Sequence, residues 1–211
     1  MFKIVSLSDT HDHLAFTVPA GDLLIHAGDA TEHGQQAGLE EVNRWFISQP
    51  HAHKIFVPGN HDLLFQKNLL LARSILNSAI CLIDEEVTLS GLRIYGSPWT
   101  PKHGNWAFML SEKELYGKFA MIPEAVDVLI THSPPFEILD HGWGANNGSI
   151  SLRRRLQEMK FPPKLHFFGH IHPAHGTTKI GATQHFNIAL CDEKKQLKRA
   201  ATVVHYDQVV P

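Results

Sequence analysis

The sequence predicts an α/β fold with a metal site at the carboxyl ends of its strands. Short apolar runs, typical of buried strands, alternate with longer amphipathic segments that are typical of helices. Five of the apolar runs are followed directly by a small cluster of Asp, Asn or His residues, which favour loops. Loops at the carboxyl ends of strands converge in α/β sheets and bind ligands there, so the five clusters are expected to form one shared site.

The first half of the chain alternates strands with helices. Strands are predicted over residues 2–7, 23–27 and 54–57. A helix is predicted over 36–48, where the apolar residues fall on one face, and a second helix over 62–77. Alternation of this kind implies right-handed crossovers and parallel pairing of the strands.

The second half begins with hairpins and then returns to strands. Ser111 and Glu114 form a candidate capping box for a short helix. Ser149 or Ser151 is expected to start another helix, which runs through Lys160 and stops before two prolines. The β-like runs of this half are 80–83, 87–89, 92–95, 126–130, 165–168, 184–188 and 201–206.

The composition is that of a soluble globular protein, and one domain over residues 1–211 is expected. Hydrophobic residues make up 43% and charged residues 19% of the chain. The net charge of −2 gives no general attraction to nucleic acid or anionic membrane, so no stable nucleic-acid complex is expected. No apolar run approaches the roughly 18 residues of a membrane helix, and no secretory signal pattern opens the sequence. Cys81 and Cys191 form no motif, which favours ordinary thiols in a reducing cytoplasm.

The residue types in the five clusters suit divalent metal ions. The clusters are Asp9-Thr10-His11, Gly28-Asp29, Gly59-Asn60-His61-Asp62, Thr131-His132 and Gly169-His170-Ile171-His172. Alternate residues of an extended chain project to one side, as expected for Asp9 with His11 and for the later histidine pair. Carboxylate and imidazole donors without cysteine favour Mn, Fe or Zn over Ca and disfavour a structural zinc site.

Other members of the clusters add to this picture. Asp29 offers a carboxylate that could bridge two cations, and Asn60 offers a neutral amide oxygen. His61 follows in the same turn, where Asp62 is available to orient its ring. Gly169 lets the backbone approach its neighbours closely.

Each cluster alone also has an ordinary structural interpretation. Gly28-Asp29 and Gly59-Asn60 are frequent turn dipeptides, Thr131-His132 can simply end a strand, and Asp62 can cap the following helix. None of these interpretations explains why all five clusters coincide with strand ends. The other histidines among the 16 in the chain are expected on the surface or in the core, with His33, His103 and His141 on loops that could reach a substrate.

In this order the five clusters resemble the signature of the calcineurin-like metallophosphoesterase superfamily. The resemblance runs from Asp9 to His172, and residues 95–101 (YGSPWTP), 131–135 (THSPP) and 168–172 (FGHIH) resemble its metallophosphoesterase-domain-containing branch. Members of that branch are associated with hydrolysis of cyclic nucleotide phosphodiesters. The resemblance implies a four-layer α/β/β/α sandwich of two mixed β-sheets flanked by helices, with a dinuclear metal site at strand carboxyl ends.

The resemblance also implies a role for each site residue. One metal would be held by Asp9, His11, Asp29 and His172, and the other by Asp29, Asn60, His132 and His170. His61, paired with Asp62, would be the acid or charge stabiliser beside the metals. Glu32 departs from the pattern, because many relatives carry Asp three residues after the Gly-Asp carboxylate.

The sequence therefore predicts a dinuclear-metal phosphoric ester hydrolase, in which a metal-bridging hydroxide attacks phosphorus in line. A small cyclic nucleotide is the favoured phosphodiester, because the chain has no capping domain and no basic tract. Mn²⁺ is the favoured metal, with Fe, Zn, Co or Ni as alternatives. The candidate substrate contacts are the loop residues Trp99, His103, Trp106 and His141. The alternative functions are a phosphomonoesterase or nucleotidase, a nuclease, and a non-catalytic metal-dependent binding module.

Overall fold

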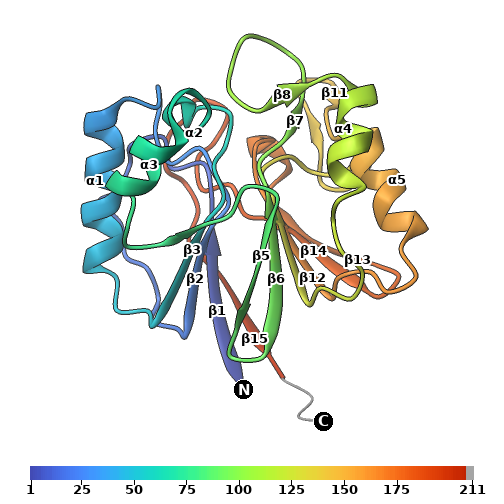
Figure 1. Cartoon of the computed structure of the whole chain (residues 1–211), viewed down its shortest axis with the longest axis horizontal. Coiled ribbons are helices and arrows are strands. Elements are labelled where there is room, and N and C mark those ends of the chain that lie inside the picture. The colour runs from blue at the N-terminus through green and yellow to red at the C-terminus, as the bar shows by residue number, and fades with distance from the viewer. Residues whose placement is uncertain (208–211) are drawn as a thin grey trace.

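Two large β-sheets pack face to face in this computed structural model, and helices cover their outer faces (Figure 1). The structure describes residues 1–207, so the last four residues of the predicted domain 1–211 lie outside the described part. The arrangement confirms the predicted four-layer sandwich of two mixed sheets. No helix within residues 1–207 is long and apolar enough to cross a membrane.

The first sheet has five strands in the order β15-β1-β2-β3-β4. Strands β1 to β4 pair in parallel, as the alternation with helices predicts, and β15 pairs antiparallel with β1. The strand bounds are β1 (Phe2–Leu7), β2 (Leu23–His26), β3 (His53–Phe56), β4 (Ile80–Cys81) and β15 (Thr202–Tyr206). Strand β4 is shorter than the predicted run 80–83.

The second sheet has six strands in the order β13-β14-β12-β9-β6-β5. Its four central strands are parallel, and antiparallel hairpins β13–β14 and β5–β6 form its two edges. The strand bounds are β5 (Glu85–Leu89), β6 (Leu92–Ser97), β9 (Val128–Thr131), β12 (Leu165–Phe168), β13 (Gly176–Ile180) and β14 (Thr183–Asn187). Two small sheets join β7 (Thr100–Pro101) with β8 (Met109–Leu110), and β10 (His141–Gly142) with β11 (Ala145–Asn146).

The helices divide between the two outer faces. Figure 1 shows α1 to α3 beside the first sheet and α4 and α5 beside the second. Their bounds are α1 (Gln36–Ser48), α2 (Leu63–Lys67), α3 (Leu69–Ile75), α4 (Glu112–Phe119) and α5 (Ile150–Glu158), with a 3₁₀ turn η1 (His172–Ala174). Both halves of the predicted capping box at Ser111 and Glu114 are formed, and Ser149 caps α5.

Three apolar clusters fill the spaces between the four layers. Ile25 of β2 and Phe167 of β12 meet in the cluster between the sheets, whereas Leu24 packs outward under α1 to α3. Adjacent residues of one strand enter different clusters because successive side chains point to opposite faces. Leu129 of β9 likewise packs outward, against Leu115 of α4. The apolar cluster between the sheets therefore holds them together, so that their polar loops lie at the same edge of the sandwich.

The predicted helix over 62–77 is divided in two. Asn68 has a non-helical φ of −152°, and its side chain accepts a hydrogen bond from the Leu71 backbone nitrogen. Asn68 therefore ends α2 and caps α3. Asp62 stands at the N-cap position of α2, but its side chain makes no capping hydrogen bond. Its carboxylate is used elsewhere in the site described below.

Candidate metal centre

The loops that follow five strands meet at one edge of the sandwich. Asp9, Asp29 and Asn60 follow strands of the first sheet, whereas His132 and His170 follow strands of the second. All of these side chains are buried except that of His170, which is partly exposed. The polar clusters predicted from the sequence therefore lie together, at the seam between the two sheets.

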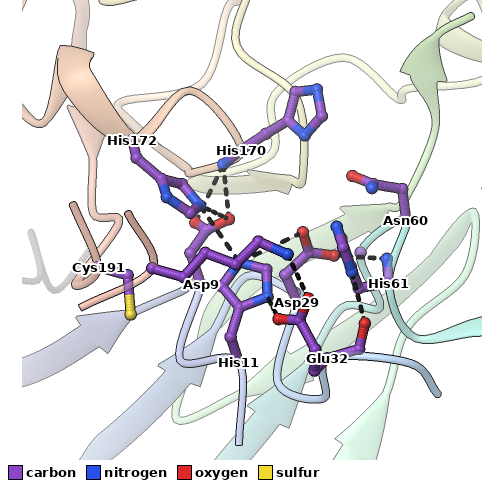
Figure 2. A network of polar contacts seen from close by, with 12 residues as sticks. Asp9, His11, Asp29, Glu32, Asn60, His61, His170, His172 and Cys191 are labelled. Carbon is purple, nitrogen blue, oxygen red and sulfur yellow. Dashed lines mark hydrogen bonds and ion pairs between the residues drawn. The ribbon is translucent and has the colours of Figure 1, made fainter. Parts of the chain in front are cut away.

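The first group of side chains consists of Asp9, His11 and His172. The Nε2 atom of His172 lies 3.3 Å from Nε2 of His11 and 3.3 Å from Oδ1 of Asp9. Figure 2 shows these side chains converging from separate loops, with Asp29 beside them. Oδ2 of Asp29 is 3.9 Å from Nε2 of His11. This group matches the residues expected around one metal.

The second group consists of Asp29, Asn60, His132 and His170. Nε2 of His132 is 3.3 Å from Oδ1 of Asp29 and 3.0 Å from Oδ1 of Asn60. A ring nitrogen of His170 lies within 4.8 Å of the donor atoms of Asp29 and His132. The two oxygens of Asp29 thus face different groups, which is the arrangement that a carboxylate bridging two cations requires.

Two histidines of the site, His132 and His172, each donate Nδ1–H to a backbone carbonyl. The acceptors are the Ala27 carbonyl for His132 and the Asp192 carbonyl for His172, both at 2.8 Å. A carboxylate oxygen of Glu32 lies 3.1 Å from Nδ1 of His11, without the geometry of a hydrogen bond. Carbonyl oxygens only accept, so in their neutral forms the rings of His132 and His172 keep the lone pair at Nε2. Nε2 of His172 therefore faces Nε2 of His11 and Oδ1 of Asp9, each at 3.3 Å. These donors fit a divalent cation.

The backbone at these residues is strained. Asp9, His11, Asp29 and His170 have φ angles of 55°, 43°, 53° and 67°. Non-glycine residues rarely adopt this left-handed conformation, and it gathers at functional sites where the surrounding structure enforces it. The expectation that Asp9 and His11 project to one side of an extended chain is therefore wrong. Tight left-handed turns direct both side chains into the site.

The carboxylates give the site a strongly negative field. Burial alone would raise the pKa of Asp29, but the charge and hydrogen bond of His132 hold it well below its usual range. Burial alone would lower the pKa of His132, whereas the neighbouring Asp29 carboxylate raises it to about 9. At His11 burial prevails over the charge of Asp29 and lowers the pKa to about 4. The same field that favours a proton on His132 favours a metal cation.

His61 lies at the rim of the first group. Its Nδ1 atom donates to the Glu32 carbonyl at 2.6 Å, and its backbone nitrogen donates to Oδ1 of Asp29 at 2.8 Å. The ring stacks on Trp106 with 4.1 Å between centroids and meets the ring of His11 edge-on at 4.8 Å. With Nδ1 bonded outward, Nε2 is the nitrogen left to face the site.

Asp62 does not orient the His61 ring, which corrects the expectation from the sequence. Its buried carboxylate accepts hydrogen bonds from the Gly59 backbone nitrogen (2.8 Å) and the Thr31 hydroxyl (2.9 Å). Burial and the charge of Asp29 together raise its pKa to about 6. A fully buried carboxylate needs several donors, and two neighbouring loops supply them. Asp62 therefore joins the loop after β2 to the loop after β3.

Glu32 lies between His11 and Lys195, a position that the sequence does not predict. One oxygen of its carboxylate faces Nδ1 of His11, and the other pairs with Nζ of Lys195. Its backbone carbonyl accepts from His61, as described above. Partial burial would raise the pKa of Glu32, but the hydrogen bond from Lys195 and the charge of His11 lower it. Neither Lys195 nor Asp192 belongs to a recognised motif, so only the structure reveals their contact with the site.

The four candidate substrate contacts lie in different parts of the structure, and only some of them are beside the donor groups. Trp106 stacks on His61, and His103 lies 5.1 Å from His170 between ring centroids. Trp99 instead donates its indole N–H to Asp84 at 2.7 Å, and Nζ of Lys118 covers its ring at 4.3 Å. Trp99 also packs against the apolar clusters of both outer faces, so its role as a substrate contact stays a prediction.

His141 and His103 lie on different hollows of the surface. His141 is exposed on β10 and lines a hollow with Glu137 and His175. His103 and His170 instead line a cavity of about 440 Å³ together with Trp143. The structure thus brings His103 and Trp106 to the site, but not Trp99 or His141.

Comparisons with known proteins agree with this geometry. The sequence matches the calcineurin-like phosphoesterase family over residues 2–174. The human and mouse proteins named metallophosphoesterase domain-containing protein 1 are each 37% identical over 90% of this chain, which spans 66% of their length. A UPF0046 protein of Caenorhabditis elegans is 35% identical over 99% of this chain and 82% of its own length. A crystal structure from Thermus thermophilus shares the fold, with a TM-score of 0.61 and 12% identity over 88% of both chains.

Proposed function

The chain belongs to the calcineurin-like phosphoesterase family, and from that membership we propose that it hydrolyses phosphate esters with the aid of two divalent metal ions. The main support for the proposal is the position of the Asp29 carboxylate. Asp29 directs one carboxylate oxygen toward His11 and the other toward His132, between two groups of donors. Binding of a single ion does not need a carboxylate shared in this way, whereas phosphoryl chemistry on two ions does.

The donor groups divide between two metal positions. Asp9, His11, Asp29 and His172 would hold the first ion, and Asp29, Asn60, His132 and His170 the second. Mn²⁺ is the favoured ion, since the imidazole, carboxylate and amide donors suit it. Two bound ions supply Lewis acidity and lower the pKa of water from about 15.7 towards neutrality.

The residues of the chain itself orient the ester and move a proton. His61 would face the phosphoryl group with Nε2, because Nδ1 is bonded to the Glu32 carbonyl. The protonated ring stabilises charge on the phosphoryl oxygens and gives its Nε2 proton to the leaving oxygen as the ester bond breaks. The Glu32 carbonyl and the stacked Trp106 keep the ring in place during this transfer.

Small cyclic nucleotides are the proposed substrates. The cavity of about 440 Å³ beside His170 lies within the usual size range for small-molecule pockets. His103 and Trp143 line it, and Trp143 is 64% exposed, so an aromatic face is available there for a base. Stacking of a base on an aromatic side chain contributes about 1–3 kcal/mol.

A panel of phosphate esters tests this proposal. Metal-free protein reconstituted with Mn²⁺ is given 2′,3′- and 3′,5′-cyclic nucleotides, nucleoside monophosphates and single-stranded DNA. We expect the highest kcat/KM for one of the cyclic nucleotides. Preference for the monophosphates would instead assign a phosphomonoesterase, and preference for DNA a nuclease. Lack of turnover of every ester with Mn, Fe, Co, Ni and Zn would overturn the proposal as a whole.

A further inference from the structure

A turn near the carboxyl end of the described chain reaches the candidate metal centre. It consists of residues 192–196 and lies beyond the residues matched by the family, which end at 174. The strand-like segment before it is joined to the end of β1, because the Leu190 backbone nitrogen donates to the Ser8 carbonyl at 3.0 Å. Figure 2 shows Cys191, the residue before the turn, on the same side of the site as Asp9 and His172. The turn is thus anchored next to Asp9.

The turn has a defined internal structure. The carboxylate of Asp192 accepts hydrogen bonds from the backbone nitrogens of Lys194 and Gln196, both at 2.9 Å. The Asp192 backbone nitrogen donates in turn to the Gln196 carbonyl at 2.8 Å. Lys195 adopts a left-handed conformation with φ of 56°. These bonds fix the direction in which the Lys195 side chain leaves the turn.

Two contacts connect the turn with the two histidines of the first metal position. The Asp192 carbonyl accepts from Nδ1 of His172 at 2.8 Å. Nζ of Lys195 pairs with Oε1 of Glu32, whose Oε2 lies 3.1 Å from Nδ1 of His11. A third contact holds the turn itself, because Nε2 of His13 bonds to the Lys195 carbonyl at 2.9 Å. One short turn therefore bonds to Nδ1 of His172 directly and reaches Nδ1 of His11 through the nearby Glu32 carboxylate.

The second metal position does not depend on this turn. His132 is held by the Ala27 carbonyl, on the loop after β2, at 2.8 Å. Asn60 and His170 belong to the loops after β3 and β12. A change in the turn should thus affect one metal position and leave the other intact.

We propose that the turn over 192–196 is a positioning device for the first metal position, in which Lys195 holds Glu32 and Glu32 holds His11 with its Nε2 directed inward. Groups that bond to the outer nitrogen of a metal-bound histidine fix its tautomer and ring orientation. Lys195 supplies the counter-charge that keeps the Glu32 carboxylate facing His11 rather than turned to solvent. The inference rests on the proposed function only in that the first position binds a divalent ion.

Titration of the metal-free full-length chain with Mn²⁺ tests this inference. The wild-type chain should bind two ions. Lys195→Met keeps the aliphatic stem and removes the charge, and it should weaken one of the two ions by about 10-fold or more while the other is unchanged. Glu32→Gln should weaken the same ion, and the double variant should be no weaker than Glu32→Gln alone. Lys195→Arg should restore binding.

Lys194→Met is the matched control, because Lys194 is the exposed neighbour in the same turn. It should bind both ions like the wild type. Two outcomes would overturn the inference: Lys195→Met binding both ions normally, or weakening both equally with a lower urea midpoint of the metal-free chain. A wild-type chain that binds two ions but cleaves no phosphate ester would refute the proposed function alone, and the titration would still decide the role of the turn.

Discussion

At the scale of single residues, His61 differs from the other histidines of the site in its surroundings. Its ring is stacked on Trp106, whereas its Nδ1 bonds to a backbone carbonyl as those of His132 and His172 do. It also lies within 4.8 Å of donor atoms of His11 and Asp29, close enough for a third group of potential ligands. A single substitution can distinguish between two roles of His61, proton transfer and metal ligation.

His61→Ala should retain two Mn²⁺ ions per chain and lose turnover by about 10²–10⁴-fold, the usual contribution of a positioned acid. Metal content by elemental analysis and kcat on a nitrophenyl phosphodiester measure the two quantities separately. Trp106→Phe is the control, since it keeps an aromatic stack on the ring. Loss of an ion in His61→Ala would make His61 a ligand, and unchanged turnover would remove it from the reaction.

The residues of the site could be located from the sequence, but their partners could not. Asp9, Asp29 and His132 stand directly after apolar runs, and strand ends of one sheet edge converge whatever the details of the loops. The contacts of Asp62 and Trp99 could not be predicted, because the direction of a side chain depends on hydrogen-bond partners supplied by distant segments. Asp62 turns to Thr31, and Trp99 to Asp84. The role of the predicted metal residues as ligands stays a prediction.

At the scale of elements, the approach of β12 to β1 depends on Gly169. A Cβ atom at this position would overlap Oδ2 of Asp9 and Oγ of Ser8, which are bonded to each other at 2.5 Å. The next residue donates its backbone nitrogen to Asp9 at 3.0 Å. The glycine therefore lets a loop of the second sheet hold a carboxylate of the first.

Gly169→Ala should lower the free energy of unfolding by about 1–3 kcal/mol, the usual cost of overpacking, and weaken Mn²⁺ binding through displacement of Asp9. Urea denaturation and metal titration measure the two effects. Gly117→Ala in α4 is the control, since a Cβ there meets nothing within 4 Å. It should stabilise the chain by about 0.5–1 kcal/mol. If both variants had the same free energy of unfolding and the same Mn²⁺ affinity, Gly169 would not be needed for the close approach of the two loops.

The elements themselves were predicted well where apolar periodicity is strong. The central strands and α1 lie within one or two residues of the predicted bounds. The sequence predicts a single helix over 62–77 because the apolar spacing continues across Asn68, whose capping bond depends on a local backbone turn. Apolar runs do not predict strand β13, because it is an edge strand with mostly exposed side chains.

At the scale of the whole molecule, several histidines are buried without charge. His26 is fully buried, accepts from the Gly28 backbone nitrogen and bonds to the Thr10 hydroxyl at 3.0 Å. Burial lowers its pKa from 6.5 to about 3, and burial with the charge of Arg153 lowers that of His185 to about 4. Such groups stabilise the fold above the pKa of the unfolded chain, and this stability is lost as pH falls.

The metal-free chain should therefore lose stability as pH falls from about 6.5 to about 3. In this range His26 binds a proton in the unfolded chain, whereas its buried ring stays neutral in the folded chain. His26→Asn should reduce the slope of unfolding free energy against pH by about 1.4 kcal/mol per pH unit in this window, the value for one proton. Urea denaturation at a series of pH values in chelator measures it. His205→Asn, at an exposed residue of β15, controls for loss of a histidine as such. An unchanged slope in His26→Asn would contradict the lowered pKa of His26 in the folded chain.

The candidate centre draws its donors from both sheets, so the fold as a whole brings its two halves together. Asp9 and Asp29 come from the first sheet, and His132 and His170 from the second. A cation bound only by the folded arrangement stabilises that arrangement in proportion to its binding free energy. Catalysis, metal binding and stability should thus change together when the metal is removed.

The proposed hydrolysis of phosphate esters requires two divalent ions held between the two sheets. The most direct test follows hydrolysis of bis(4-nitrophenyl) phosphate while metal-free protein is titrated with Mn²⁺. We expect no turnover in chelator and a rate that rises until two ions are bound per chain. Turnover that is independent of metal, or that is complete with one ion per chain, would contradict the proposal.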